Sequence, residues 1–176
     1  MEKKKNKNGK DKSFPEFKEK WLNELKDFRI SKKDYIQLDN TLSKRFGKKG
    51  KERDIIWALM NQALINNIND YIKQYHIYYL MGKFIRDEGK NDSNQYFELS
   101  TKSLLLKYKS EGIRKVRFLA SLGERTCNSC LKLNGKMFDI EEALKNIPAP
   151  SKECKNKDDY GYVNCRCAII ALKEDQ

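Results

Sequence analysis

Histidine is almost absent from this chain, which contains only one, His76, among 176 residues. Catalytic zinc sites usually draw on histidine and keep one coordination position open for water. A single histidine inside a helical apolar pattern therefore argues against a catalytic metal centre and against a cysteine nucleophile with a histidine base. The sequence also lacks a phosphate-binding G-x-x-x-x-G-K loop, a G-x-G-x-x-G loop and an H-E-x-x-H motif.

Long apolar runs are missing as well. No stretch of about 18 apolar residues occurs, so we expect no membrane-spanning helix and no membrane partner. The first lysines are not followed by an apolar run, so we predict no secretory signal and a cytoplasmic location. In a reducing compartment clustered cysteines bind metal more often than they form disulfides, and an odd count of five fits poorly with complete pairing.

Positive charge is concentrated in the first third of the chain. The formal net charge is +12, and residues 1–53 contain 18 Lys or Arg against 9 Asp or Glu. The remaining residues contain 19 against 16 and are nearly neutral. A basic region of this kind suits nucleic acid, because each neutralised phosphate releases counterions. The alternative is a solvated region that only keeps the protein soluble.

The sequence predicts an α+β fold that is mostly α. Residues 1–12 contain no large apolar side chain apart from the initial Met, and we expect a disordered basic tail there. Residues 13–112 show helical apolar spacing and are expected to form a body of about four to five helices. Residues 113–176 are expected to form a small zinc-stapled module with a β-hairpin and a short helix.

Polar residues mark where these helices begin. Ser13 is expected to cap the first helix. Ser31 is expected to cap the second through a capping box with Asp34, three residues further on. Ser93 precedes another apolar pattern, which we expect to end at Gly112.

The longest helical pattern covers residues 52–86 and is long for a single helix. A break is therefore expected near residues 66–70 or around His76. Tyr79, Gly82 and the following Glu-Gly-Lys turn weakly resemble one tetratricopeptide hairpin. No second copy occurs at a 34-residue interval, which favours a plain antiparallel helix pair.

After these helices the apolar period changes to two, which is typical of strands. We predict short strands over residues 116–121, 136–138 and 167–172. Between the second and third of them, Asp139 followed by Glu142 predicts a capping box that starts a short helix.

All five cysteines lie in the last fifty residues, as a C-x-x-C, a single cysteine and a C-x-C: Cys127, Cys130, Cys154, Cys165 and Cys167. Zn²⁺ in structural sites binds four ligands in a tetrahedron and accepts thiolates. The pattern predicts a structural Zn²⁺ site that joins distant parts of the chain. Reduced, buried cysteines that bind no metal are the alternative.

Three cysteines compete for the last two ligand positions. In an extended C-x-C segment the two side chains point to opposite faces, so both can bind one ion only if the backbone turns there. This favours Cys127, Cys130 and Cys154 together with either Cys165 or Cys167. The pair Cys127 and Cys130 with both Cys165 and Cys167 is the other arrangement.

One longer pattern resembles a known family. Residues 124–138 read E-R-T-C-x-x-C-x-x-L-x-G-K-x-F, and prolines and the segment N-C-R-C at residues 164–167 follow. This resembles the C-terminal cysteine module of phage head-morphogenesis (minor head, phage Mu F-like) proteins, over about residues 117–172. Many members have a histidine two residues before N-C-R-C, where this chain has Tyr162, and Cys154 is a candidate substitute. The resemblance implies a metal module of phage origin.

These features predict a non-enzymatic, zinc-stabilised binding protein that is phage-derived. Its expected partner is nucleic acid, bound through the basic N-terminal region, or a protein. One alternative is a nuclease, or a component of one, guided by the basic arm. A second alternative is a helical protein–protein adaptor.

Overall fold

The computed structural model describes residues 14–88, 93–155 and 165–172. Over these residues it confirms the predicted mostly helical α+β fold, with seven α-helices and three strands. The chain separates into two compact units, residues 1–63 and 64–176. The predicted division into a helical domain, residues 13–112, and a cysteine module, residues 113–176, stays a prediction. The predicted tail, residues 1–12, lies outside the described residues.

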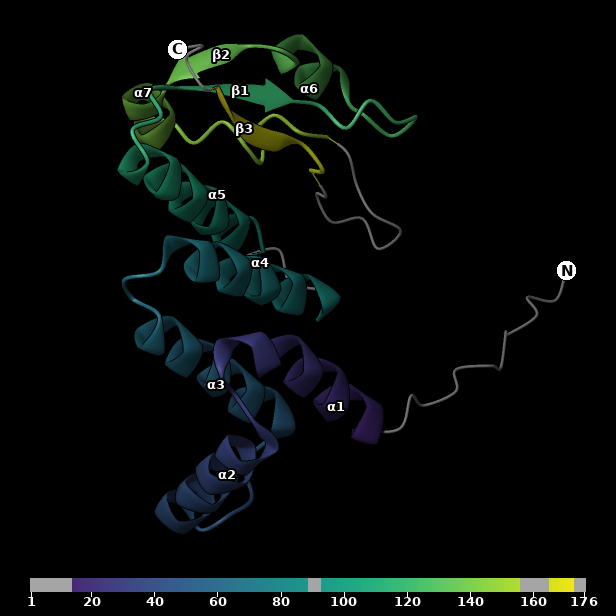
Figure 1. The fold of residues 1–176 in the computed structure, drawn as a ribbon. Coiled ribbons are helices and arrows are strands. Elements are labelled where there is room, and N and C mark those ends of the chain that lie inside the picture. Colours follow the sequence, from purple (N-terminus) through teal and green to yellow (C-terminus); the bar gives the residue numbers. More distant parts are fainter. Residues whose placement is uncertain (1–13, 89–92, 156–164, 173–176) are drawn as a thin grey trace, which may run out of the picture. The chain divides into compact units, whose positions relative to one another are not determined.

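The first unit is helical. It contains α1 (Phe14–Leu25), a short 3₁₀ helix η1 (Lys26–Phe28), α2 (Lys32–Phe46) and most of α3 (Glu52–Asn66) (Figure 1). Its large buried side chains recur at helical spacing: Trp21, Leu25, Phe28, Tyr35, Ile55, Ile56, Leu59 and Met60. Ser13 lies outside the described residues.

The capping box predicted at the second helix is confirmed. The Asp34 carboxylate accepts the Ser31 backbone N–H at 2.8 Å, and the Ser31 hydroxyl accepts the Asp34 N–H at 3.4 Å. Because Ser31 donates hydrogen bonds to the ionised carboxylate, the pKa of Asp34 is lowered. Gly47 ends α2 with a φ of 66°, a left-handed conformation that costs a glycine little.

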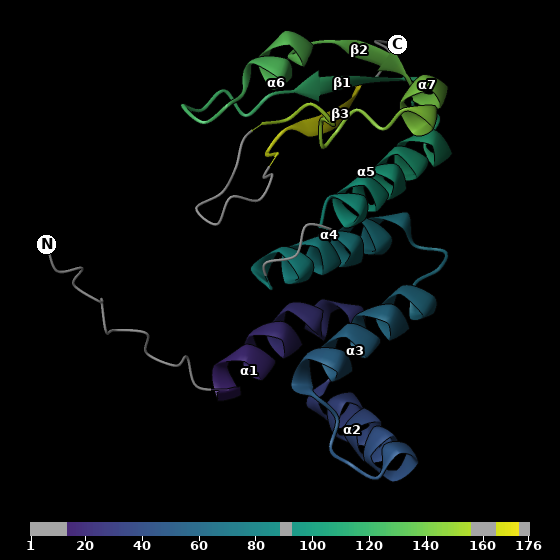
Figure 2. The same ribbon diagram turned by 180° about the vertical axis from the view of Figure 1, so that it is seen from behind.

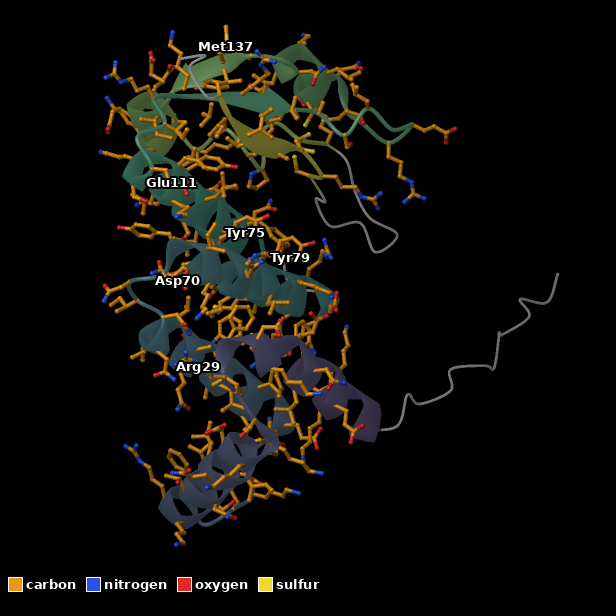
Figure 3. The ribbon with its side chains drawn as sticks, in the orientation of Figure 1. Arg29, Asp70, Tyr75, Tyr79, Glu111 and Met137 are labelled. Carbon is orange, nitrogen blue, oxygen red and sulfur yellow. The ribbon has the colours of Figure 1, made fainter. Side chains whose placement is uncertain are left out.

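The long helical pattern breaks at the first of the two predicted places. α3 ends at Asn66, and α4 (Tyr71–Asp87) begins after Asp70, whose side chain accepts the Lys73 N–H at 3.0 Å. Figure 3 labels Asp70 at this end of α4. His76 lies inside α4, and the helix continues through it.

The second unit pairs α4 with α5 (Ser93–Ser110), and the chain reverses direction between them (Figures 1 and 2). The helices approach closely at Gly82, where an added Cβ would lie 2.7 Å from the Phe97 ring. The predicted helix pair is therefore present. Gly112 follows α5 with a φ of 80° and turns the chain toward the sheet.

The sheet is antiparallel, with β1 (Lys115–Leu119) between β2 (Met137–Asp139) and β3 (Ala168–Leu172) (Figure 1). Val116 pairs with Phe138 on one side and with Ala171 on the other, and Phe118 pairs with Ile169. Val116 and Phe118 are buried because alternate residues of a strand face the same side. Figure 3 labels Met137 on the outer strand β2, where its side chain is exposed.

Two short helices accompany the sheet: α6 (Asn128–Leu133), which was not predicted, and α7 (Ile140–Lys145). The capping box predicted for α7 is wrong. Asp139 occupies the N-cap position, but its side chain makes no capping hydrogen bond. The buried residues of this core come from α5, the sheet, the residue after β1, both short helices and the loop after α7: Leu105, Val116, Phe118, Ala120, Cys130, Ile140, Ala143, Ala149, Cys154 and Ile169.

Within the described segments, no helix is both long and apolar enough to cross a membrane.

Candidate metal centre

Five cysteine side chains from three separate segments meet at the edge of the core of the second unit. Cys127 occupies the N-cap of α6, and Cys130 lies in its first turn. Cys154 lies in the loop after α7, where its N–H donates to Ser151 O at 2.9 Å. Cys165 and Cys167 come just before β3. The pairing of β3 with β1 carries this last segment back to α6.

The sulfur atoms form two overlapping groups of three. The Sγ atoms of Cys127, Cys130 and Cys154 all lie within 4.8 Å of one another, and so do those of Cys130, Cys165 and Cys167. Cys127 lies 3.7 Å from Cys154, and Cys130 lies 3.9 Å from Cys165, measured between Sγ atoms. Cys130 belongs to both groups, so its sulfur lies within 4.8 Å of each of the other four.

Within each group of three, one sulfur–sulfur distance matches the spacing expected in a tetrahedral thiolate site. A zinc–sulfur bond of about 2.3 Å gives a separation of about 3.8 Å between two sulfurs of a regular tetrahedron. The two measured separations of 3.7 and 3.9 Å lie on either side of that value. All five thiols are free, with no disulfide among them. The donor set and its spacing can therefore hold a metal ion that favours sulfur ligands.

The strand β3 begins one residue later than predicted, and this matters for the C-x-C segment. Cys165, Arg166 and Cys167 have no strand structure, so the alternation of a strand does not apply to them. The sulfurs of Cys165 and Cys167 lie within 4.8 Å of each other and of Cys130, so the two side chains do not point to opposite faces and could share one ion. The choice among Cys154, Cys165 and Cys167 stays a prediction.

Burial and neighbouring thiols raise the pKa of two of these cysteines. Burial raises the pKa of Cys130, and its hydrogen bonds with Cys127 and Cys167 raise it further. Burial also raises the pKa of Cys167. Neighbouring thiolates repel one another in a buried site, so several can be charged together only beside a cation.

The pKa of Cys127 shifts in the opposite direction from those of Cys130 and Cys167. Burial acts to raise its pKa, but hydrogen bonds with Ser129 and with the backbone N–H groups of Cys130 and Lys155 outweigh this effect and lower the pKa to about 6. Backbone N–H groups at the start of a helix stabilise negative charge in this way. Cys127 is therefore more readily ionised than Cys130 or Cys167 before a metal binds.

Ser129 connects α6 to the loop that carries Cys154. Its hydroxyl donates to Glu153 O at 2.8 Å and lies 3.1 Å from Cys127 Sγ. The same hydroxyl has a single proton, so it can donate to only one of these partners at a time. Sequence reasoning did not single out Ser129, although its place inside the C-x-x-C was a usable signal.

The other candidate residues lie elsewhere. His76 is exposed on α4, where its ring packs edge-on against Tyr75 with centroids 4.8 Å apart. Glu141 and Glu142 are exposed in the first turn of α7. Two adjacent aspartates at residues 158–159 would also be candidate metal ligands, but they fall outside the described residues. In the segments that the structure describes, the two cysteine groups are the only sets of three or more His, Cys, Asp or Glu arranged to hold a metal.

Comparisons with protein families, with curated proteins and with solved structures found no match to this chain.

Proposed function

We propose that this chain is a non-enzymatic binding protein whose C-terminal module is stabilised by one structural Zn²⁺, held by four of its five cysteine thiolates. The observation that carries the proposal is the convergence of sulfurs from three segments in two groups of three that share Cys130. One sulfur–sulfur distance in each group, 3.7 Å and 3.9 Å, matches the spacing of a zinc–thiolate tetrahedron. Cys127 and Cys130 belong to both predicted ligand sets. The remaining two ligands come from Cys154, Cys165 and Cys167.

The chemistry of the donor set favours a structural role for this ion. Four thiolates fill a tetrahedral site and leave no position for a reacting water, whereas catalytic zinc sites keep one open. Cys130 and Cys154 are buried among the core side chains of the sheet and helices. An ion bound there would join α6, the loop after α7 and the start of β3, so its binding free energy would add to folding stability.

We propose nucleic acid as the partner, bound through the basic N-terminal region. A cavity of about 800 Å³ in the first unit supports this, because its lining includes more cationic than anionic side chains. The cationic ones are Lys18, Lys26, Arg29 and Lys32, and the anionic ones are Glu19 and Glu52. A protein ligand with an acidic surface is the alternative partner for the same region.

The motif resemblance supports a proposal about the origin of the cysteine module. The cysteine pair, the L-x-G-K segment and the final N-C-R-C are the features that this chain shares with phage head-morphogenesis proteins. On that basis we propose that the module is of phage origin. The resemblance rests on these residues and does not extend to the helices before residue 112.

The zinc proposal is tested on the full chain, purified under reducing conditions. We expect one zinc per chain by elemental analysis, and a native mass that falls by one zinc when a strong chelator is added. We also expect chelation to lower the midpoint of thermal unfolding and readdition of Zn²⁺ to restore it. A metal-free protein that unfolds at the same temperature with and without zinc would refute the proposal.

The nucleic-acid proposal has a separate test. The six lysines of residues 1–12 are replaced by glutamine, and duplex DNA binding is measured as salt is raised. The logarithm of affinity should fall linearly with the logarithm of salt for the natural chain, and the slope should be shallower for the variant. Equal slopes for the two proteins would exclude a role for these lysines.

A further inference from the structure

A second cavity, of about 740 Å³, lies between the helix pair α4–α5 and the C-x-C segment, entirely within the second unit. Its volume falls in the range of ligand sites, about 300–1,000 Å³. We name it the tyrosine groove. Its lining includes four aromatic rings and two arginines: Tyr75, Tyr79, Phe97, Tyr108, Arg86 and Arg166. Of the described residues that line it, none is Asp or Glu.

Two aromatic rings of the tyrosine groove pack against each other at an angle. Tyr79 and Phe97 have ring centroids 5.6 Å apart with a tilt of 54°. The Arg86 guanidinium lies 5.7 Å from the Phe97 centroid, so a cation borders the same ring. Figure 3 shows Tyr75 and Tyr79 along one side of α4, and the side chain of Tyr79 is 47% exposed. An aromatic surface is thus open to a ligand.

Arg166 connects the tyrosine groove to the metal centre. It is exposed, and it lies between Cys165 and Cys167, whose sulfurs belong to the cysteine cluster. A metal bound to either neighbour would restrain the backbone of Arg166 and so reduce the conformational freedom lost when its side chain meets a ligand. For the position of Arg166, the inference below rests on the proposed zinc centre.

We infer that the tyrosine groove binds a short stretch of single-stranded nucleic acid, with bases against the aromatic rings and phosphates near Arg86 and Arg166. Aromatic rings combined with arginines match both chemical parts of a nucleotide, because bases stack on rings and phosphates pair with guanidinium groups. Duplex nucleic acid keeps its bases stacked on one another and cannot use the rings. An acidic peptide would use the arginines but would gain nothing from the ring faces.

Fluorescence anisotropy with the zinc-loaded full chain tests this inference. The probes are labelled eight-nucleotide dT and rU oligomers at a fixed, near-physiological salt concentration, and zinc content is measured for every sample. Tyr79→Ala removes an exposed ring, and Arg166→Gln removes the charge beside the metal centre. Because base stacking on one aromatic residue contributes strongly to affinity, we expect each variant to bind about tenfold more weakly.

Two control variants distinguish binding in the groove from non-specific attraction by positive charge and from a loss of folding. Tyr79→Phe keeps the ring, and Arg114→Gln removes one exposed positive charge outside the groove. Both should bind within about twofold of the natural chain. Tighter binding of one oligomer would identify DNA or RNA as the preferred form of the same ligand.

Three outcomes would overturn the inference. The zinc-loaded chain could fail to bind either oligomer, all four variants could bind equally well, or a poly-glutamate peptide could compete as strongly as unlabelled oligomer. Oligomer binding by a protein that carries no zinc, with the same loss in Tyr79→Ala, would support the groove and refute the zinc centre instead. The two proposals can therefore fail separately.

Discussion

Replacing Cys130 by serine is the most direct perturbation of the metal centre. Its sulfur is the one shared by both groups of three, and its side chain is only 1% exposed. Both predicted ligand sets include it. Serine preserves the approximate size of the side chain, but its hydroxyl stays protonated at neutral pH and does not replace a thiolate. We therefore expect Cys130→Ser to weaken zinc binding whichever other cysteines complete the site.

The expected loss can be estimated from the number of ligands. Structural zinc sites in small peptides have binding free energies of about 10–16 kcal/mol at neutral pH. Divided over four thiolates, this gives about 3 kcal/mol for each ligand, which corresponds to an increase in the dissociation constant on the order of a hundredfold. The buried position of Cys130 adds a packing cost, so thermal stability should fall even at saturating zinc.

Competition against a chromophoric chelator measures the dissociation constant for zinc, and calorimetry measures thermal unfolding. The four other Cys→Ser variants are made in parallel. Cys127→Ser should resemble Cys130→Ser, and one of Cys154→Ser, Cys165→Ser and Cys167→Ser should bind zinc like the natural chain, because a tetrahedral ion has no place for a fifth thiolate. An unchanged dissociation constant for Cys130→Ser would refute the geometry on which the centre is built.

Three further predictions concern the chain without added partners. In metal-free protein, alkylation of Cys127 by iodoacetamide should rise with pH around a midpoint of about 6, because the thiolate is the nucleophile. Peptide mass mapping measures the alkylated fraction at each pH. A midpoint near that of a free cysteine would contradict the prediction. Gly82→Ala should destabilise the protein by about 1 kcal/mol in urea unfolding, because overpacking against Phe97 outweighs the gain in helix propensity. A more stable variant would show that the Phe97 ring moves aside without cost. Ser31→Ala should cost about 1 kcal/mol by loss of the α2 cap, whereas Ser31→Asp should retain most of the stability; equal losses in both would exclude capping as the cause.

Local features of the sequence predicted much of the helical part, because they depend on residues only a few positions apart. The Ser31 cap and the break before Asp70 follow from side chains that bond to backbone groups within one turn. The strand containing Val116 and Phe118 was visible from its alternation. The short helix α6 was missed because six residues carry too little periodic pattern to distinguish a helix from a turn.

By itself, the sequence determined the residue types of the candidate centre and their grouping into a C-x-x-C, a single cysteine and a C-x-C. Only the tertiary structure decided that Cys130 lies between the other sulfurs and that Arg166 borders an aromatic groove. Both facts depend on the pairing of β1 with β3, which brings together residues about fifty positions apart. Such a pairing is selected by burial of the whole core, and no short stretch of sequence encodes it.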